Sequence, residues 1–494
     1  MFKIDPIPEP ECPSDLFAVQ INGFAALAYQ ARVSRIPFNQ VWPGHQRPPE
    51  HTELAAFISF DTDETVELSV TPQRSFSNAV IRPLSKKITP RRSGNTLTFR
   101  VSPGDMLSLE LDGHHQNLHI FANLPLCHPK QRKPDVLYFG PGTHDAGQIV
   151  LHDRQTLVID SGAVVYGSVL IQDAKHVRVC GHGILCNAAQ TRTGLCFPSS
   201  FLDRKEQMLP DSLQALEAHP EAKTVSSTGC MKIIRSQDVL IEGIIFRDSA
   251  EWTATVGNCT DVTFDNVKTI GMWRYNADGI DFCNSSNGVI KNSFLRNFDD
   301  NIVVKGLKPF DGMDAKTLLF EKNVIWCDWG RGLEIGAETC SDEICGIVFR
   351  DTDILHGTYA HMDIQNGDRG HVYDVLYENI RVEYSKYETE PVYQQNDAMQ
   401  YAPGPTPHMP DLFDAIVMHC YWSQDTSRGK ITDITLRDIA VQIDEGLPLP
   451  KIGLVGLDAQ HGVQGVKIES LTVNGAPVCV SIEKNAFVSD IQLQ

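Results

Sequence analysis

The sequence predicts an all-β chain in which a right-handed parallel β-helix follows a small antiparallel β-sandwich. The first observation behind this prediction is a repeat. Short apolar phrases rich in Val, Ile and Phe recur from Val239 to Val375 at steps of 23, 26, 30, 29 and 28 residues. One alternating strand per period, separated by polar turns, is typical of a solenoid. The apolar spacing of three and four that a helical repeat needs is missing, so strands are favoured.

The second observation is that the N-terminal part follows a different pattern. Runs of alternating apolar and polar residues, bounded by Pro, Gly, Asp and Asn, predict about six to eight antiparallel strands, each with one face exposed to solvent. These runs are Phe17–Ile21, Leu54–Phe60, Thr65–Val70, Thr96–Val101, Met106–Leu111 and Leu118–Phe121. A polar, Pro-flanked stretch at 127–134 has no periodicity and is typical of a boundary. We therefore predict a β-sandwich domain over residues 1–130 and a β-helix domain over residues 131–494.

Two insertions interrupt the repeat. They lie at 187–225 and 385–425 and predict long loops over one face of about nine or ten coils, where they wall off a binding groove. Apolar residues within 209–218 fall at helical spacing, which predicts a short helix inside the first insertion.

Composition excludes several classes of partner. Hydrophobic residues at 42% and charged residues at 21% are typical of a soluble globular protein. A net charge of −19 disfavours binding to nucleic acid or to an anionic membrane, because both depend on Lys and Arg. The chain as given has no apolar run of secretory or membrane-spanning length, so we expect a cytoplasmic protein. The composition predicts no particular oligomeric state.

The 13 cysteines are scattered, and most lie in strand-like apolar surroundings. Their odd number and positions predict buried, reduced thiols. The closest pairs, Cys180 with Cys186 and Cys340 with Cys345, have no second pair at zinc spacing, so neither a metal nor another cofactor is predicted.

Three aspartates are the strongest candidates for catalysis. Asp278 precedes Asp299 by 21 residues, about one coil, and Asp300 follows directly. Neighbouring strands are roughly 4.8 Å apart, so carboxylates on adjacent coils are close enough to cooperate. Adjacent residues on an ideal strand point to opposite faces, so both members of the pair Asp299 and Asp300 can face one site only if the backbone bends there. Hydrolysis of a glycosidic bond needs an acid and a base, which such carboxyls supply.

The motifs around these aspartates resemble a known family. Asp248-Ser-Ala-Glu-Trp252, Asn276-Ala-Asp-Gly-Ile-Asp281 and Asp299-Asp300 are similar in order and spacing to motifs of glycoside hydrolase family 28, the polygalacturonases, over roughly residues 135–480. An N-terminal sandwich before a β-helix is similar to the family 49 dextranases. The resemblance implies an inverting glycosidase in which Asp299 is the general acid, while Asp278 and Asp300 activate water.

Two departures from the family pattern concern the substrate. Gly330-Arg331-Gly332 stands where polygalacturonases have Gly-His-Gly, and Asp363-Ile364-Gln365 stands where they have Arg-Ile-Lys. Exchanging two cations for an acid and an amide removes the electrostatic complement of a uronate. We therefore expect a neutral sugar at this subsite, or a carboxylate bound elsewhere with Arg331 as its candidate partner, and a neutral or mixed oligo- or polysaccharide as substrate.

Further residues are candidates for sugar binding. Arg331, Glu334 and Glu338 follow the catalytic coil by one turn, and an ion pair of Glu334 with Arg331 or Lys305 is the competing interpretation. Trp273, in a polar loop before Asp278, is a candidate for stacking on a pyranose, as is Trp329. Trp252 is expected in the core by its motif position. The predicted substrate-binding residues are Arg331, Glu334, Glu338, Asp363, Gln365, Trp273 and Lys305.

Other functions remain open on the same scaffold. One alternative is a polygalacturonase-type hydrolase of a uronate. Another is a polysaccharide lyase or a fructotransferase, although a lyase acting on uronates needs cations or calcium near the substrate carboxylate. A calcium site or a row of turn-capping aspartates is the competing interpretation of the three carboxylates, and a non-catalytic glycan-binding solenoid is a further one.

Overall fold

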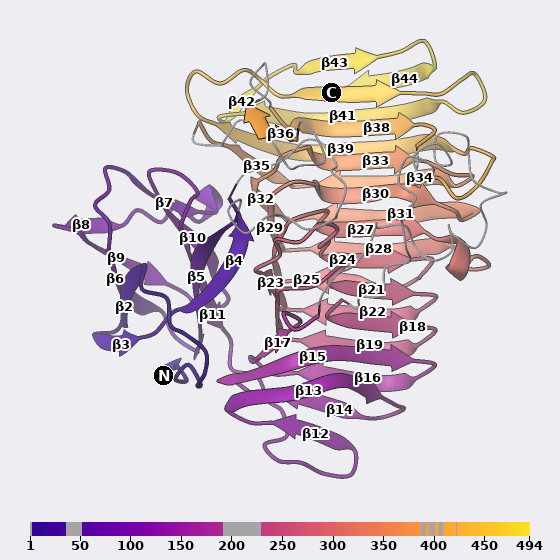
Figure 1. The fold of residues 1–494 in the computed structure, drawn as a ribbon. Coiled ribbons are helices and arrows are strands. Elements are labelled where there is room, and N and C mark those ends of the chain that lie inside the picture. Colours follow the sequence, from indigo (N-terminus) through magenta and orange to yellow (C-terminus); the bar gives the residue numbers. More distant parts are fainter. Residues whose placement is uncertain are drawn as a thin grey trace.

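The protein is built almost entirely of β-strands (Figure 1). The computed structural model describes residues 2–35, 52–190, 229–386, 392–394, 401–403, 409–420 and 422–494. Within these ranges the α-helix is absent, and the helical turns are the 3-10 segments η2 (Leu84–Lys86) and η4 (Lys308–Phe310). No helix in the described part is long and apolar enough to cross a membrane. The predicted helix at 209–218 and most of the predicted loop at 187–225 lie outside the described residues. The predicted loop at 385–425 is too long at its C-terminal end, because Asp411–Val417 is a strand that pairs with the coil before it.

Eleven described strands in two sheets form the N-terminal part. The six-stranded sheet holds β1 (Phe2–Lys3), β4 (Tyr29–Ser34), β5 (Thr52–Thr62), β7 (Ala79–Arg82), β10 (Met106–Leu111) and β11 (Leu118–Asn123). The five-stranded sheet holds β2 (Phe17–Ile21), β3 (Phe24–Ala26), β6 (Val66–Pro72), β8 (Arg91–Ser93) and β9 (Thr96–Val101). One shared core of side chains from both sheets makes this a β-sandwich. There are more strands than predicted because β1, β3 and β8 are too short to show alternation. A second difference is that β5 and β11 pair in parallel, whereas antiparallel strands were predicted.

A right-handed parallel β-helix follows, as the repeat predicted. Strands three apart in the chain pair in parallel, so successive coils stack into three columns (Figure 1). The column that carries the candidate site, the site sheet, consists of β18 (Met231–Ile234), β21 (Ala254–Gly257), β24 (Ile280–Cys283), β27 (Ile302–Gly306), β30 (Arg331–Thr339), β33 (Ala360–Asn366), β38 (Asp411–Val417), β40 (Lys451–Val455) and β43 (Ser481–Lys484).

Two further columns complete the coils. The sandwich-facing sheet consists of β17 (Ile184–Cys186), β20 (Ile245–Arg247), β23 (Lys268–Ile270), β26 (Phe294–Asn297), β29 (Val324–Cys327), β32 (Asp353–His356) and β35 (Arg381–Tyr384). The outer sheet consists of β12 (Val136–Phe139), β14 (Thr156–Ile159), β16 (Lys175–Cys180), β19 (Gln237–Glu242), β22 (Thr260–Asp265), β25 (Val289–Lys291), β28 (Ala315–Glu321), β31 (Glu343–Arg350), β34 (His371–Glu378), β39 (Lys430–Ile443), β41 (Val463–Val473) and β44 (Val488–Leu493). The remaining strands are β13 (Gly142–Leu151), β15 (Ala163–Gln172), β36 (Val392–Gln394), β37 (Tyr401–Pro403) and β42 (Ala476–Pro477).

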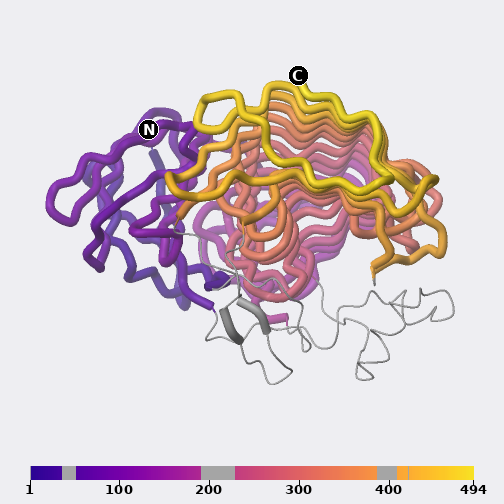
Figure 2. The backbone as a smooth tube through the Cα atoms, turned by 90° about the horizontal axis from the view of Figure 1, so that it is seen from above, coloured from indigo at the N-terminus to yellow at the C-terminus, as the bar shows by residue number. Residues whose placement is uncertain are grey.

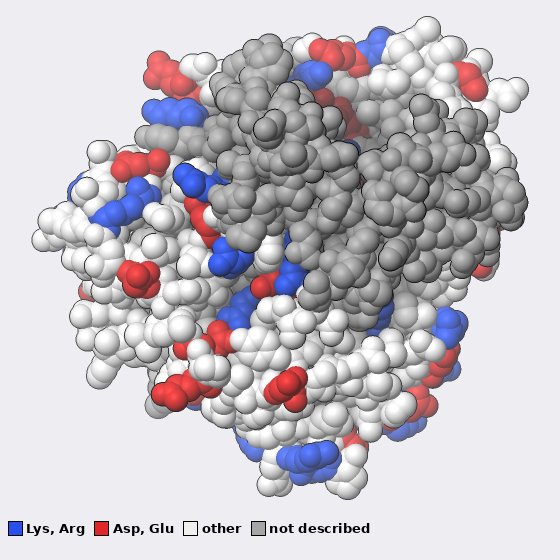
Figure 3. Space-filling view, viewed as in Figure 1, with Lys and Arg blue, Asp and Glu red and all other residues white. Residues whose placement is uncertain are grey.

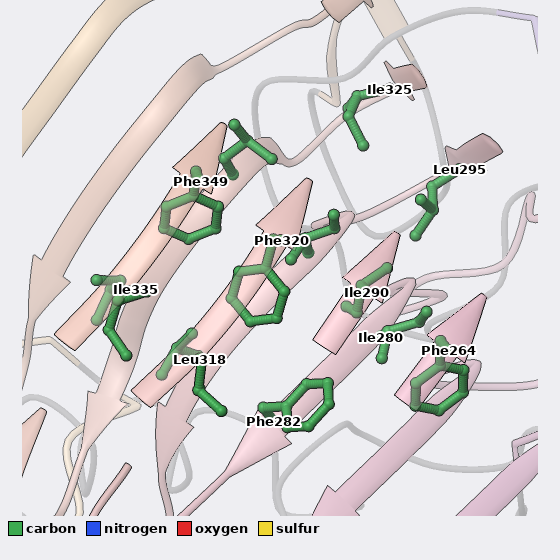
Figure 4. Packing of buried hydrophobic residues seen from close by; sticks show 14 of the residues in the cluster. Phe264, Ile280, Phe282, Ile290, Leu295, Leu318, Phe320, Ile325, Ile335 and Phe349 are labelled. Carbon is green, nitrogen blue, oxygen red and sulfur yellow. The ribbon is translucent and has the colours of Figure 1, made fainter. Parts of the chain in front are cut away.

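The core of the β-helix is a stack of side chains from equivalent positions of successive coils. Phe264, Ile290, Phe320 and Phe349 are partners in register on four neighbouring strands of the outer sheet, and all four are fully buried (Figure 4). The turns between strands explain the Asn and Asp punctuation of the sequence. Asn266, Asn292, Asp351 and Asn379 have positive φ angles of 56, 51, 53 and 51°. Asn and Asp tolerate this left-handed conformation better than other residues with a Cβ atom.

The six-stranded sheet packs against the sandwich-facing sheet (Figures 1 and 2). One buried apolar cluster joins the two parts: it includes Phe57 and Phe121 from the sandwich and Phe294 and Trp326 from the β-helix. Charged groups are buried in the same interface. Arg296 is 1% exposed, and its Nη1 donates a hydrogen bond of 2.8 Å to Asn117 Oδ1.

A buried ion network in this interface predicts a stability effect. Glu110 is 3% exposed; its carboxylate lies 3.0 Å from Arg82 Nε and 2.8 Å from His356 Nε2, and Arg82 also pairs with Glu383. Burial alone raises the pKa of Glu110, but the charges of His356 and Arg82 hold it well below its usual range. Glu110→Gln leaves buried cations unbalanced, so we expect the free energy of unfolding in urea to fall by about 3 kcal/mol.

The matched control is Glu67→Gln. The Glu67 side chain is 51% exposed and lies 3.4 Å from Arg91, so its removal is expected to change the free energy of unfolding by less than about 1 kcal/mol. Equal effects of the two substitutions would mean that the buried network contributes no more than a surface pair.

Candidate active site

The three catalytic candidates lie on two adjacent coils, at the turn that leads into the site sheet. Asp278 precedes β24, and Asp299 and Asp300 lie between β26 and β27. The two turns are hydrogen-bonded to each other, because Gly279 N–H donates to the Asp300 carbonyl at 2.7 Å. The spacing of about one coil therefore does bring the two clusters together.

The backbone bends at the Asp299-Asp300 pair, as the prediction required. Phe298 and Asp299 form a bend outside the flanking strands, and the fully buried Phe298 ring stacks on Trp329 at 5.6 Å and 7°. Both carboxyls then approach Gly330 on the next coil. A Cβ added at Gly330 lies 2.6 Å from Asp299 Oδ1 and closer still to Asp300 Oδ1. Only glycine leaves room for two carboxyls at this point.

The surroundings of Asp278 favour its protonated form. It is 2% exposed, and its Oδ1 has no hydrogen-bond partner in the described part of the chain. Burial, followed by the charges of Asp299 and Asp281, raises the pKa of Asp278 well above its usual value. Asp281 is fully buried beside it, and burial raises the pKa of Asp281 in the same way.

Asp300 has the opposite electrostatic surroundings. The Arg331 backbone N–H donates to Asp300 Oδ1 at 2.8 Å, and Arg331 Nη1 lies 3.8 Å from the same oxygen. Burial raises the pKa of Asp300, but the Arg331 charge and a hydrogen bond from Glu334 outweigh burial, and the pKa is lowered. Burial and the charge of Asp300 raise the pKa of Glu334 well above its usual value. Neighbouring carboxyls with pKa values pushed apart are suited to separate acid and base roles.

Carboxyls surround the Arg331 guanidinium. Its Nε lies 3.0 Å from Asp363 Oδ2 and 4.0 Å from Glu334 Oε1, and its Cζ lies 4.5 Å from the centre of the Tyr359 ring. Gln365 Nε2 donates to Asp363 Oδ2 at 2.9 Å. Burial raises the pKa of Asp363 to about 7. Arg331 therefore faces three carboxyls inside the site, and Asp300 is the one whose pKa is lowered.

The second cation of the site is also balanced by carboxyls. Lys305 is 4% exposed, and its Nζ donates to Glu338 Oε2 at 3.1 Å. Burial lowers the pKa of Lys305, but the charges of Glu338 and Asp278 outweigh burial and raise it well above its usual value. Lys305 Nζ lies 4.9 Å from the centre of the Trp252 ring.

The structure corrects two predictions about tryptophans. Trp252, expected in the core, is only half-buried and contacts Lys305, because it stands in the turn before β21 and not inside a strand. Trp329, a candidate for sugar stacking, is 7% exposed and packs between Phe298 and Tyr275 in the core. Trp273 is half-buried, and its indole N–H donates to Asp248 Oδ1 at 2.9 Å.

Two residues of the site were not predicted. Asp414 is in register with Asp363 on the next coil, and burial raises the pKa of Asp414 to about 8. Tyr359 is 39% exposed and lies over Arg331. Strand alternation places Glu334 and Asp363 in register on the outward side of the site sheet, because Leu333 and Met362 beside them point into the core.

The predicted site residues thus form one connected cluster, apart from Trp273. The described residues contain no group of three or more His, Cys, Asp or Glu arranged to hold a metal ion. Among the described residues on the face shown in Figure 3, basic and acidic side chains are interspersed and neither sign forms a broad patch.

Known proteins are similar to this chain in part of its sequence and in its fold. Residues 215–405 match the family model of the glycosyl hydrolases family 28. Rhamnogalacturonase A of Aspergillus niger is 28% identical over 152 residues, 30% of this chain and 32% of that protein, and rhamnogalacturonase A of Aspergillus aculeatus is 27% identical over 152 residues. The alignment spans about a third of the length of these curated relatives.

A solved structure shares the whole fold. Dex49A from Penicillium minioluteum superposes with a TM-score of 0.58 at 13% identity, over 100% of this chain and 96% of that one. The resemblance to family 28 predicted from the motifs is confirmed over residues 215–405, and the chain shares its fold with Dex49A.

Proposed function

We propose that the protein is an inverting glycoside hydrolase of a neutral or mixed oligo- or polysaccharide. The observation that carries this proposal is the approach of Asp299 and Asp300 to one point beside Gly330, with Asp278 on the adjacent coil. The pKa values of Asp278 and Asp300 are moved in opposite directions. Paired carboxyls of this kind supply the acid and the base of glycoside hydrolysis. The relationship to family 28 supports the same reaction.

Each carboxyl has a separate role in the proposed reaction. Asp299 gives its proton to the glycosidic oxygen as the bond from that oxygen to the anomeric carbon breaks. Asp278 and Asp300 hold a water on the opposite side of the sugar ring, and this pair takes the proton of the water as its oxygen bonds to the anomeric carbon. Attack from the face opposite the leaving group inverts the configuration.

The surroundings of the two cations support a neutral sugar beside Arg331. A uronate carboxylate needs an unbalanced cation, but Arg331 lies within 4.0 Å of Asp363 and Glu334, and Lys305 lies 3.1 Å from Glu338. The curated relatives are rhamnogalacturonases, named for a glycan that contains both rhamnose and galacturonate, which suits a mixed substrate. Sugar hydroxyls can instead hydrogen-bond to Asp363 and Gln365.

The test is a comparison of galacturonate oligosaccharides before and after chemical reduction of their carboxyls to primary alcohols, beside a panel of neutral glucans. Reduction changes the charge and keeps the linkage. We expect kcat/KM to be at least about tenfold higher for the reduced form, because its hydroxyl needs no cation. Proton NMR in the first minutes of the reaction is expected to detect the inverted anomer.

Each alternative has a distinct result in the same experiment. Faster cleavage of the unreduced form would favour a polygalacturonase-type hydrolase. Unsaturated products would favour a lyase, and transfer of the sugar to a second sugar would favour a fructotransferase. Retention of configuration would contradict the inverting mechanism, and a chain that binds glycans without cleaving any of them would be a binding module.

A further inference from the structure

By the motif resemblance, Arg331 stands where polygalacturonases have a histidine, and its contacts suit a function of a different kind. Arg331 is the first residue of β30, one coil beyond Asp300. Two of its groups meet the same oxygen: the backbone N–H at 2.8 Å and the guanidinium Nη1 at 3.8 Å from Asp300 Oδ1. The backbone contact is available to any residue at this position, but the charge is not.

We propose that Arg331 is a positioning residue whose guanidinium holds Asp300 as the carboxylate that accepts the proton of water, so that Asp300 and not Asp278 is the base. This inference rests on the proposed hydrolysis and assigns different roles to Asp278 and Asp300, the two carboxyls that hold the water. Asp278, which is buried beside Asp281 and Asp299, keeps its proton and acts as a hydrogen-bond donor.

The guanidinium is held in place from two sides. Asp363 Oδ2 lies 3.0 Å from Nε, and the ring of Tyr359 lies 4.5 Å from Cζ. Gln365 fixes Asp363 in turn, by the hydrogen bond of 2.9 Å to the same Oδ2 atom. The residues that replace the uronate-binding cations of polygalacturonases therefore have a second role here, which is to orient Arg331 toward Asp300.

Titratable groups face Asp300 from several elements. Asp278 and Asp281 face it from the coil before, Lys305 from β27, Arg331 and Glu334 from β30, and Asp363 from β33. The carboxyl of Asp299 lies beside it at Gly330, and the thiol of Cys327 faces it from β29. Burial and the negative charge of any ionised carboxylate nearby favour the protonated form of Asp300, whereas Arg331, Lys305 and the hydrogen bond from Glu334 favour the ionised form. Arg331 is the strongest of the opposing groups, and the pKa of Asp300 is lowered.

The expected pH effect follows from this balance. Loss of the guanidinium raises the pKa of Asp300, so that the base becomes protonated at a higher pH. The acidic limb of kcat/KM, which reports the free enzyme, then moves to higher pH, and activity returns above the new limb. A residue that only supports the fold would lower activity at all pH values.

The test compares Arg331→Met and Arg331→Lys with wild type. We expect the acidic limb to move up by about one pH unit or more in Arg331→Met, a tenfold change in proton affinity. The shift should be smaller in Arg331→Lys, which keeps a charge. The matched control is Arg350→Met, because Arg350 pairs with Glu321 on the outer sheet at 2.7 Å, away from the site. The acidic limb of kcat/KM in this variant should stay at the wild-type pH.

A second readout needs no turnover. The carboxyl 13C signal of Asp300, in protein labelled at aspartate and assigned with Asp300→Asn, should titrate at higher pH in Arg331→Met than in wild type. Unchanged titration of this signal would overturn the inference whether or not a substrate is known. If the wild-type protein hydrolyses no glycan, the proposed function is contradicted. If the Asp300 signal nevertheless titrates at higher pH in Arg331→Met than in wild type, the effect of Arg331 on the charge of Asp300 is still supported.

Discussion

Asp299→Asn is expected to reduce kcat by about 10²- to 10⁴-fold, the usual contribution of a positioned general acid. The amide cannot protonate the leaving oxygen, yet it has nearly the same shape as the carboxyl that fits beside Gly330. The measurement is the rate on the best substrate of the panel, together with the melting temperature by circular dichroism, which should stay near that of wild type.

The control for this variant is Asp342→Asn, on a side chain that is 81% exposed and pairs with Arg369. Its rate should equal that of wild type. A substrate with a leaving group that needs no proton, such as a dinitrophenyl glycoside, should restore much of the lost rate in Asp299→Asn. Full activity of Asp299→Asn on ordinary glycans would show that another group is the acid.

Gly330→Ala is expected to lower kcat/KM by about 100-fold or more, because misplacement of a catalytic group by about 1 Å has an effect of this size. The added methyl would lie 2.6 Å from both Asp299 Oδ1 and the backbone nitrogen of Asp300. Backbone cannot yield as a flexible side chain does, so the bend that carries both aspartates must move. Steady-state kinetics on the best substrate measure the effect.

Gly140→Ala is the matched control. The nearest atoms to a Cβ at Gly140 belong to the Tyr138 side chain, at 3.1 Å, outside the site. Its kcat/KM should remain close to that of wild type. Wild-type kinetics in Gly330→Ala would mean that the two carboxyls do not need the space that this glycine leaves.

The β-helix could be predicted because the sequence pattern of a single coil is local and recurs in the following coils. Each coil carries its own apolar strands and its own left-handed turn residue, such as Asn266 and Asn292 with φ of 56 and 51°. The sandwich was harder to outline, since β1 and β3 have two and three residues and are stabilised by their neighbours and not by a pattern of their own. Nothing in the alternation of a single strand indicates that β5 and β11 run parallel.

The candidate site could be predicted only in part. The spacing of Asp278 and Asp299 matched one coil, so their proximity followed from the repeat. Asp414 was missed because the long insertion after Tyr384 interrupts the count that would align it with Asp363. The burial of Trp252 and Trp329 was predicted wrongly, because burial at a bend depends on which way the backbone turns. Trp329 turns inward against Phe298.

The apolar cluster shared by the sandwich and the β-helix makes the two parts one unit. Excision of the β-helix would leave Phe294, Trp326 and Ile245 facing water, together with Arg296, whose Nη1 hydrogen-bonds to the sandwich residue Asn117. A soluble β-helix would need these positions redesigned. A different partner domain would likewise require a new matching surface along several coils at once.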